Sequence, residues 1–131
     1  MKTNNLSACI VTEKIYECRE FYTKNFNAKI TFDCGWYLNM EFGNNTATLQ
    51  FMSPQQPEQP IYNGSGLMYN FDVDDVDAEY ERLMQLGNKP AMPLEDHPWG
   101  DRGFAILDPN GIMLYIYSNK EPSEEFKQFF K

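Results

Sequence analysis

The chain has 131 residues, of which 42% are hydrophobic, 15% aromatic and 23% charged. This length is typical of one globular domain with its own hydrophobic core. Nineteen acidic residues oppose eleven basic ones for a net charge of −8, and the sequence contains no basic patch of the kind that binds nucleic acid. An acidic chain suits a cationic partner, and it equally suits simple solubility.

The cysteines and the first residues give an expectation for the cell compartment. Cys9, Cys18 and Cys34 have no metal-type spacing, and an odd, sparse count indicates reduced thiols. Residues 1–5 are polar, and the longest early apolar run, 8–11, is too short for a signal peptide or a membrane span. We therefore expect a cytoplasmic protein with no membrane partner.

The first half of the chain is predicted to form a strand, a helix and three more strands. Apolar residues at Ile15, Cys18, Tyr22 and Phe26 have helical spacing, with Thr12 as a plausible N-cap. The predicted helix covers 14–25, and the predicted strands cover 6–11, 28–34, 36–42 and 46–52. Gly43-Asn44-Asn45 is a turn signal between the last two strands.

The second half repeats this order. A strand at 67–73 precedes a helix with Asp75 as N-cap and Gly87 at its C-terminal end. An edge strand at 89–94, a loop at 95–102 and strands at 103–107 and 112–118 follow, with a hairpin turn at 108–111. A C-terminal helix within 122–131, opened by Ser123, is expected to carry Phe126, Phe129 and Phe130.

The repeated order indicates two βαβββ modules within one domain, 1–131. Module 1 covers 5–53, a proline-rich linker covers 54–65, and module 2 covers 66–119. The fold class is α+β, and we expect the strands to form a curved mixed sheet with a cup-shaped cavity. Period-two alternation gives each strand one apolar face for the helices and one mixed face, which lines the cup or is instead solvated or covered by a dimer partner.

Three segments resemble the vicinal oxygen chelate superfamily of glyoxalase, bleomycin-resistance and extradiol dioxygenase proteins. They are VTEKIYECREFYTKNFNAKI, FDVDDVDAEYERLMQLG and HPWGDRGFAILDPNGIMLYIY, and the similarity runs from about Leu6 to Ser118. The Asp108-Pro109-Asn110-Gly111 turn and the Phe21-Tyr22 pair are the most recognisable pieces. The resemblance implies paired βαβββ modules, often assembled as a homodimer.

Enzymes of this superfamily hold a divalent ion with His, Gln or Glu side chains from four strand positions. The resemblance places those positions at Leu6, Thr48, Met68 and Tyr115, none of which offers an imidazole or a carboxylate. The single histidine, His97, lies beside Pro98 and is expected to be a surface or loop-packing residue. We therefore predict no metal, no cofactor and no catalytic residues.

The resemblance places the Trp99–Arg102 segment near the mouth of the cup. Trp99 could stack on a flat ligand while Arg102 grips a carboxylate. Alternatively, Trp99 closes the end of the core and Arg102 pairs with Asp101 or Asp108. Asp96 and Asp101 could act as acid and base, but loop solvation explains them better.

The preferred function is metal-independent binding of a small aromatic or cationic molecule, which resembles the bleomycin-resistance branch. The alternatives are a metal-dependent lyase or dioxygenase and a protein-interaction module. The expected partners are a small-molecule ligand and a second copy of the chain, with no nucleic acid or membrane. The expected ligand-binding residues are Tyr37, Asn39, Thr48, Gln50, Met68, Asn70, Asp72, Trp99, Arg102, Tyr115 and Tyr117.

Overall fold

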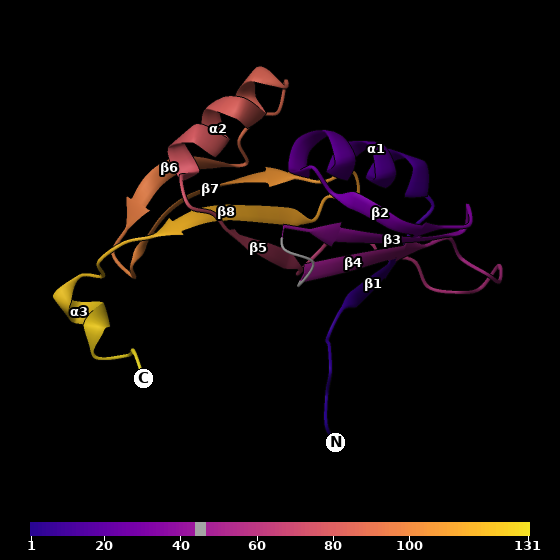
Figure 1. Ribbon diagram of the computed structural model, residues 1–131, viewed down its shortest axis with the longest axis horizontal. Coiled ribbons are helices and arrows are strands. Elements are labelled where there is room, and N and C mark those ends of the chain that lie inside the picture. Colours follow the sequence, from indigo (N-terminus) through magenta and orange to yellow (C-terminus); the bar gives the residue numbers. More distant parts are fainter. Residues whose placement is uncertain (44–46) are drawn as a thin grey trace. The chain divides into compact units, whose positions relative to one another are not determined.

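The computed structural model describes residues 1–43 and 47–131 (Figure 1). The chain divides into two compact units, Met1–Gly64 and Ser65–Lys131, and each is considered by itself. The turn predicted at Gly43-Asn44-Asn45 and the start of the next strand at Thr46 involve residues outside the described part.

The first unit is a four-stranded mixed sheet with one helix. Its elements in chain order are β1 (Ala8–Val11), α1 (Ile15–Phe26), β2 (Lys29–Asp33), β3 (Tyr37–Phe42) and β4 (Ala47–Met52). The strand order is β1-β4-β3-β2, with β1 parallel to β4 and the other neighbours antiparallel. The predicted βαβββ order is confirmed for this half.

The second unit has the same order and one additional short helix. Its elements are β5 (Met68–Asp72), α2 (Val76–Gln85), β6 (Met92–His97), β7 (Asp101–Leu107), β8 (Met113–Asn119) and α3 (Glu124–Lys127). The strand order is β5-β8-β7-β6, with β5 parallel to β8. The predicted α+β class and repeated topology are therefore confirmed.

Each helix covers the apolar face of its own sheet. In the first unit, Tyr22 of α1 is fully buried, and its ring lies 5.4 Å from that of Phe51 and 5.8 Å from that of Phe42. In the second unit, Leu83 of α2 is buried and Tyr80 meets Phe104 of β7 edge to face at 5.0 Å. Helical spacing and strand alternation together place these residues inside, where the burial of large apolar side chains stabilises each unit.

Local signals in the sequence account for several boundaries. The Asp75 carboxylate accepts the N–H of Ala78 at 3.1 Å and caps α2, as predicted. Thr12 is not the N-cap of α1, which begins after Lys14; instead its hydroxyl accepts the Lys14 N–H at 3.0 Å. At the predicted hairpin turn, the Asp108 carboxylate accepts the N–H groups of Asn110 and Ile112 at 2.8 and 2.9 Å.

Two expected element boundaries are corrected. The loop predicted at 95–102 is mostly strand, because Asp96 pairs with Arg102 and His97 with Asp101, leaving only 98–100 to connect β6 and β7. The charged residues that suggested a loop are tolerated because β6 is an edge strand. The C-terminal helix is only the four-residue α3, and Phe129 and Phe130 lie beyond it, 63% and 64% exposed.

The segment expected to be a linker, 54–65, is attached to the first unit by backbone hydrogen bonds at Tyr62 and at Ser53, the residue just before it. The N–H of Tyr62 donates to the carbonyl of Val11 at 2.8 Å, and the N–H of Ser53 donates to that of Trp36 at 2.8 Å. Residues 54–64 therefore belong to this compact unit.

Candidate functional site

A pocket of about 410 Å³ lies in the second unit, on the face of the sheet opposite α2. Its lining combines two thioethers, three aromatic rings, one amide and one carboxylate, namely Met68, Asn70, Met92, Trp99, Asp101, Tyr115 and Tyr117. Asn70 of β5 pairs in register with Tyr115 of β8, so alternation places Met68, Asn70, Tyr115 and Tyr117 on one face. Leu114 and Ile116 face the other way, into the core beneath α2.

Small residues on β7 make room for the two tyrosine rings. Tyr117 is in register with Gly103, and Tyr115 with Ala105. A Cβ atom placed on Gly103 would lie 2.6 Å from both Cζ and Oη of Tyr115, so this ring leans across bare backbone. The rings of Tyr115 and Tyr117 stack at 5.6 Å, 20° from parallel, and form one wall of the pocket.

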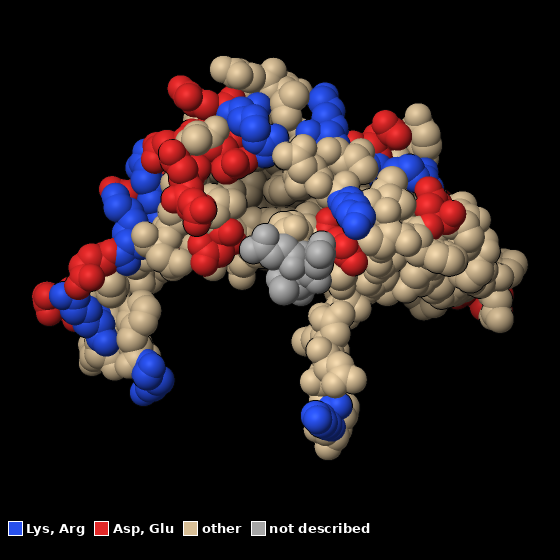
Figure 2. Space-filling model, viewed as in Figure 1, with Lys and Arg blue, Asp and Glu red and all other residues tan. Residues whose placement is uncertain are grey.

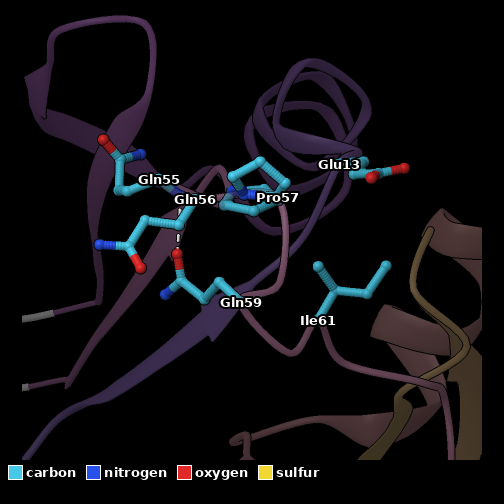
Figure 3. Close-up of a pocket in the computed structure, with 7 residues that line it drawn as sticks. Glu13, Gln55, Gln56, Pro57, Gln59 and Ile61 are labelled. Carbon is cyan, nitrogen blue, oxygen red and sulfur yellow. Dashed lines mark hydrogen bonds between the residues drawn. The ribbon is translucent and has the colours of Figure 1, made fainter.

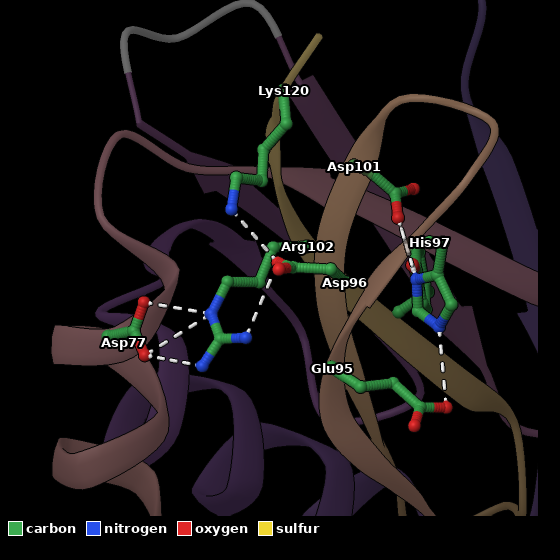
Figure 4. A network of polar contacts seen from close by, with 8 residues as sticks. Asp77, Glu95, Asp96, His97, Asp101, Arg102 and Lys120 are labelled. Carbon is green, nitrogen blue, oxygen red and sulfur yellow. Dashed lines mark hydrogen bonds and ion pairs between the residues drawn. The ribbon is translucent and has the colours of Figure 1, made fainter. Parts of the chain in front are cut away.

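The Asp101 carboxylate joins the aromatic side chains into one network. Its Oδ1 accepts the phenol of Tyr115 at 2.8 Å, and its Oδ2 accepts the indole Nε1–H of Trp99 at 2.9 Å. Nδ1 of His97 also lies 2.8 Å from Oδ1 (Figure 4). Because Asp101 is buried, with 8% of its surface exposed, these bonds replace the hydration that the carboxylate loses.

His97 is a packing residue of this network rather than a surface residue. Its ring lies parallel to that of Trp99, with centroids 4.4 Å apart and planes 3° apart. Its Nε2 faces Glu95 Oε1 at 3.6 Å, on the opposite side of the ring from Asp101 (Figure 4). One face of the Trp99 indole is thereby covered by the imidazole.

Burial and neighbouring charges keep both phenols of the pocket protonated. The pKa of Tyr115 is raised far above its ordinary value by burial and by its hydrogen bond to Asp101. The pKa of Tyr117 is raised by burial and by the negative charges of Asp72 and Asp101. Both tyrosines are therefore hydrogen-bond donors at neutral pH, in a site of negative potential.

The residues of this site do not fit a divalent metal. The two carboxylates nearest His97 engage opposite nitrogens of its ring, so Glu95, His97 and Asp101 cannot meet at one ion. Within residues 1–43 and 47–131, no group of three or more His, Cys, Asp or Glu side chains could hold one. Met68 and Tyr115, the implied ligand positions in this unit, offer a soft thioether and a protonated phenol.

The structure brings together five of the residues expected from the sequence, which are Met68, Asn70, Trp99, Tyr115 and Tyr117. Asp72 follows Asn70 on the same strand and accepts a hydrogen bond from Asn119 at 3.1 Å. The expected set lacks Met92 and Asp101. Asp101 falls in the loop predicted at 95–102, where loop solvation explained it better, and Met92 falls on the edge strand predicted at 89–94, to which no pocket residue was assigned. The alternation of Met92, Leu94 and the charged residues that follow was the available signal.

Arg102 lies on the other side of the strand from this pocket. Its guanidinium binds Asp77 of α2 at 2.9 Å and Asp96 of β6 at 3.4 Å (Figure 4). The alternative in which Arg102 pairs with Asp101 or Asp108 is wrong, because alternation along β7 turns Arg102 to the helix side. Arg102 thus connects α2 to the sheet.

The expected residues of the first unit lie together on one face of its own sheet. Tyr37, Asn39, Thr48 and Gln50 share one face of β3 and β4. The Gln50 amide donates to Asn39, whose own amide donates to Thr31. The pKa of Tyr37 is raised by burial and by Cys9.

A second pocket, of about 490 Å³, lies in the first unit beside the 54–61 segment (Figure 3). Its lining is Glu13, Pro54, Gln55, Gln56, Pro57, Gln59 and Ile61, with no aromatic ring among them. The Gln59 side chain already accepts the Gln55 N–H at 2.6 Å, so this amide orders its own loop. This pocket therefore presents no aromatic ring for binding a ligand, whereas the pocket of the second unit presents three.

The surface of the second unit intermixes acids and bases. Lys120 binds Asp96 at 3.0 Å and Lys127 binds Glu121 at 2.9 Å. Figure 2 shows Lys and Arg side chains scattered among acidic ones on the visible face. In the described part of the chain, every helix is too short or too polar to cross a membrane.

The profile of the glyoxalase/bleomycin resistance protein/dioxygenase superfamily matches residues 6–116. The chain belongs to this superfamily. A glyoxalase/bleomycin resistance protein/dioxygenase from Nocardioides has a similar fold, with a TM-score of 0.73 and 21% identity over 92% of this chain and 86% of that one. TnmS3, an antibiotic binding protein from Streptomyces sp. CB03234, has a TM-score of 0.71 and 20% identity over 91% of this chain and 98% of that one.

One curated relative is an uncharacterized protein of Mycobacterium bovis. It is 38% identical over 48 residues, which are 37% of this chain and 32% of that protein. The chain thus matches about a third of the length of this relative.

Proposed function

We propose that this superfamily member binds a small molecule carrying a flat aromatic group or a positive charge, without using a metal ion. The observation that carries the proposal is the pocket of the second unit, where three aromatic rings surround a buried carboxylate. A concave site with apolar walls and a few fixed polar groups is the usual setting for a small ligand.

The aromatic part of the ligand is inferred from Trp99. The indole is 45% exposed, and one of its faces is covered by His97. Its N–H is already bound to Asp101, so the opposite ring face is what Trp99 offers. A flat ring placed there gains stacking in addition to buried apolar area.

The preference for a cation is inferred from the charges around the site. Asp72 lies exposed on the same face of β5 as Asn70, and its charge raises the pKa of Tyr117, whereas the nearby Arg102 is bound to Asp77 on the helix side. Negative potential beside aromatic faces favours an ammonium or amidinium group. The antibiotic binding protein of similar fold supports small-molecule binding as an activity that this architecture can carry.

The test uses the variant Trp36→Phe, in which Trp99 is the only tryptophan. Flat aromatic amines are titrated while the emission of Trp99 and the melting temperature are followed. We expect quenching and a raised melting temperature. Trp99→Leu should weaken binding about 5-fold, from roughly 1 kcal/mol of lost stacking. Gln56→Ala, in the pocket of the first unit, is the matched control and should bind as the parent does.

Two results count against the proposal. Stoichiometric Ni, Fe, Mn or Zn that survives purification, with stability lost in EDTA, favours the metal-dependent enzyme. No response to any compound, together with a tight heteromeric protein partner, favours the interaction module.

Assembly and location follow from the sequence expectations. We propose a cytoplasmic homodimer, as the family resemblance and the sparse cysteines suggest. Light scattering should give twice the 15.3 kDa of one chain. A mass of one chain at micromolar concentration contradicts the dimer.

A further inference from the structure

We propose that Asp101 is the positioning residue of the pocket in the second unit: its carboxylate fixes the rings that contact the ligand instead of binding the ligand itself. This inference rests on the proposed function. It assigns a role to Asp101, a residue that the sequence alone explains by loop solvation.

The first argument is the place of each partner in the chain. Trp99 lies in the turn between β6 and β7, Tyr115 lies on β8, and His97 ends β6. One buried carboxylate accepts from the first two and contacts the third, all within 2.9 Å. The β6–β7 hairpin and β8 therefore have a common attachment point at the start of β7.

The second argument is the capacity of the carboxylate. A carboxylate has about four acceptor positions. At least two of those on Asp101 are taken by the Tyr115 and Trp99 donors, and His97 lies against Oδ1 as well. Little capacity remains for a ligand, so the influence of Asp101 on binding must pass mainly through the rings.

The third argument concerns the contacts that hold the Trp99 and His97 rings in place, which depend on the Asp101 carboxylate. Trp99 is half-exposed and lies within a sharp turn, next to Gly100, whose φ is 118°. The indole is held by its hydrogen bond to Asp101 and by the parallel ring of His97, which contacts the same carboxylate. Loss of the charge therefore loosens both layers of the stack, and a ligand then has to order them at a cost to affinity.

The experiment compares Asp101→Asn with its parent, both carrying Trp36→Phe. Without any ligand, acrylamide quenching of Trp99 should rise at least 2-fold. The affinity for 9-aminoacridinium and for neutral acridone, two flat three-ring probes, should fall by a similar factor of about 10. In a Trp99→Phe/Tyr115→Phe background, which keeps two rings but removes both donors, Asp101→Asn should change affinity less than 2-fold.

Each contrary outcome has a distinct meaning. Unchanged Trp99 quenching in Asp101→Asn overturns the positioning role. A loss confined to the cationic probe and abolished by salt shows direct charge attraction and also overturns it. If neither probe binds the parent protein, the proposed function fails, while the quenching measurement still decides the role of Asp101.

A second measurement leaves Asp101 unchanged, so it tests the proposal even if the Asp101→Asn protein does not fold. In the Trp36→Phe protein, the only indole N–H signal in a ¹⁵N-correlated NMR spectrum belongs to Trp99. Its exchange with water should be at least 10-fold slower than that of free indole, because Asp101 accepts this proton at 2.9 Å. Exchange at the free rate overturns the proposal.

Discussion

The substitution Gly103→Ala tests how the tyrosine wall of the pocket is built. A new Cβ would lie 2.6 Å from Cζ and Oη of Tyr115 and 3.0 Å from the carbonyl oxygen of Ile116. Replacing a strand glycine by alanine without a clash stabilises a protein by about 0.4–1 kcal/mol. Overpacking a filled site costs about 1–3 kcal/mol, and displacing the phenol from Asp101 adds about 1–3 kcal/mol. The steric cost therefore exceeds the gain from alanine, and we expect a net loss of stability of about 1–6 kcal/mol.

Urea denaturation followed by circular dichroism measures this loss. The matched control is the same substitution in a Tyr115→Val background, where the ring is absent and only the Ile116 contact remains. There the cost should fall below about 1 kcal/mol. A Gly103→Ala protein as stable as its parent, or an equal cost in both backgrounds, would refute the account of this wall.

Other predictions concern the cores, a helix cap and pH. Phe51→Ala should cost about 3–5 kcal/mol, whereas Phe129→Ala, at an exposed position, should change stability by less than about 0.5 kcal/mol. Asp75→Ala should cost about 1 kcal/mol; Ser123→Ala is its control, since that side chain makes no cap bond. The raised pKa of Tyr115 contributes stability below pH about 10 that is lost as pH rises further. Unfolding free energy should therefore fall less steeply above pH 10 in Tyr115→Phe, and equal slopes would contradict this.

The order of elements could be predicted because local signals agree with the tertiary structure. Apolar residues at helical spacing meet the alternating faces of neighbouring strands, as when Tyr22 packs on Phe51. Asp75 and the Asp108 turn act through hydrogen bonds to backbone groups two to four residues away, so their effect is visible in the sequence.

The start of β7 could not be predicted for a physical reason. Residues 95–102 are charged and contain proline and glycine, a composition that favours a loop. Their strand character comes from pairing across the hairpin, where His97 faces Asp101. The partners of Asp101 are divided between this hairpin and β8, and Tyr115 is 14 residues away. Contacts at that separation leave no periodic signal.

The polar network also explains how this unit can keep an ordered pocket without an ion. At Tyr115, a position where the resemblance implies a metal ligand, the phenol donates to Asp101. Its single oxygen is protonated, and the carboxylate that could have joined a ligand set is surrounded by Trp99, His97 and Tyr115. Side chains that a cation would otherwise draw together are thus held by hydrogen bonds among themselves. Creating a metal site here would therefore require removing this network as well as adding donors, so Tyr115→His alone should leave zinc affinity weak in a calorimetric titration.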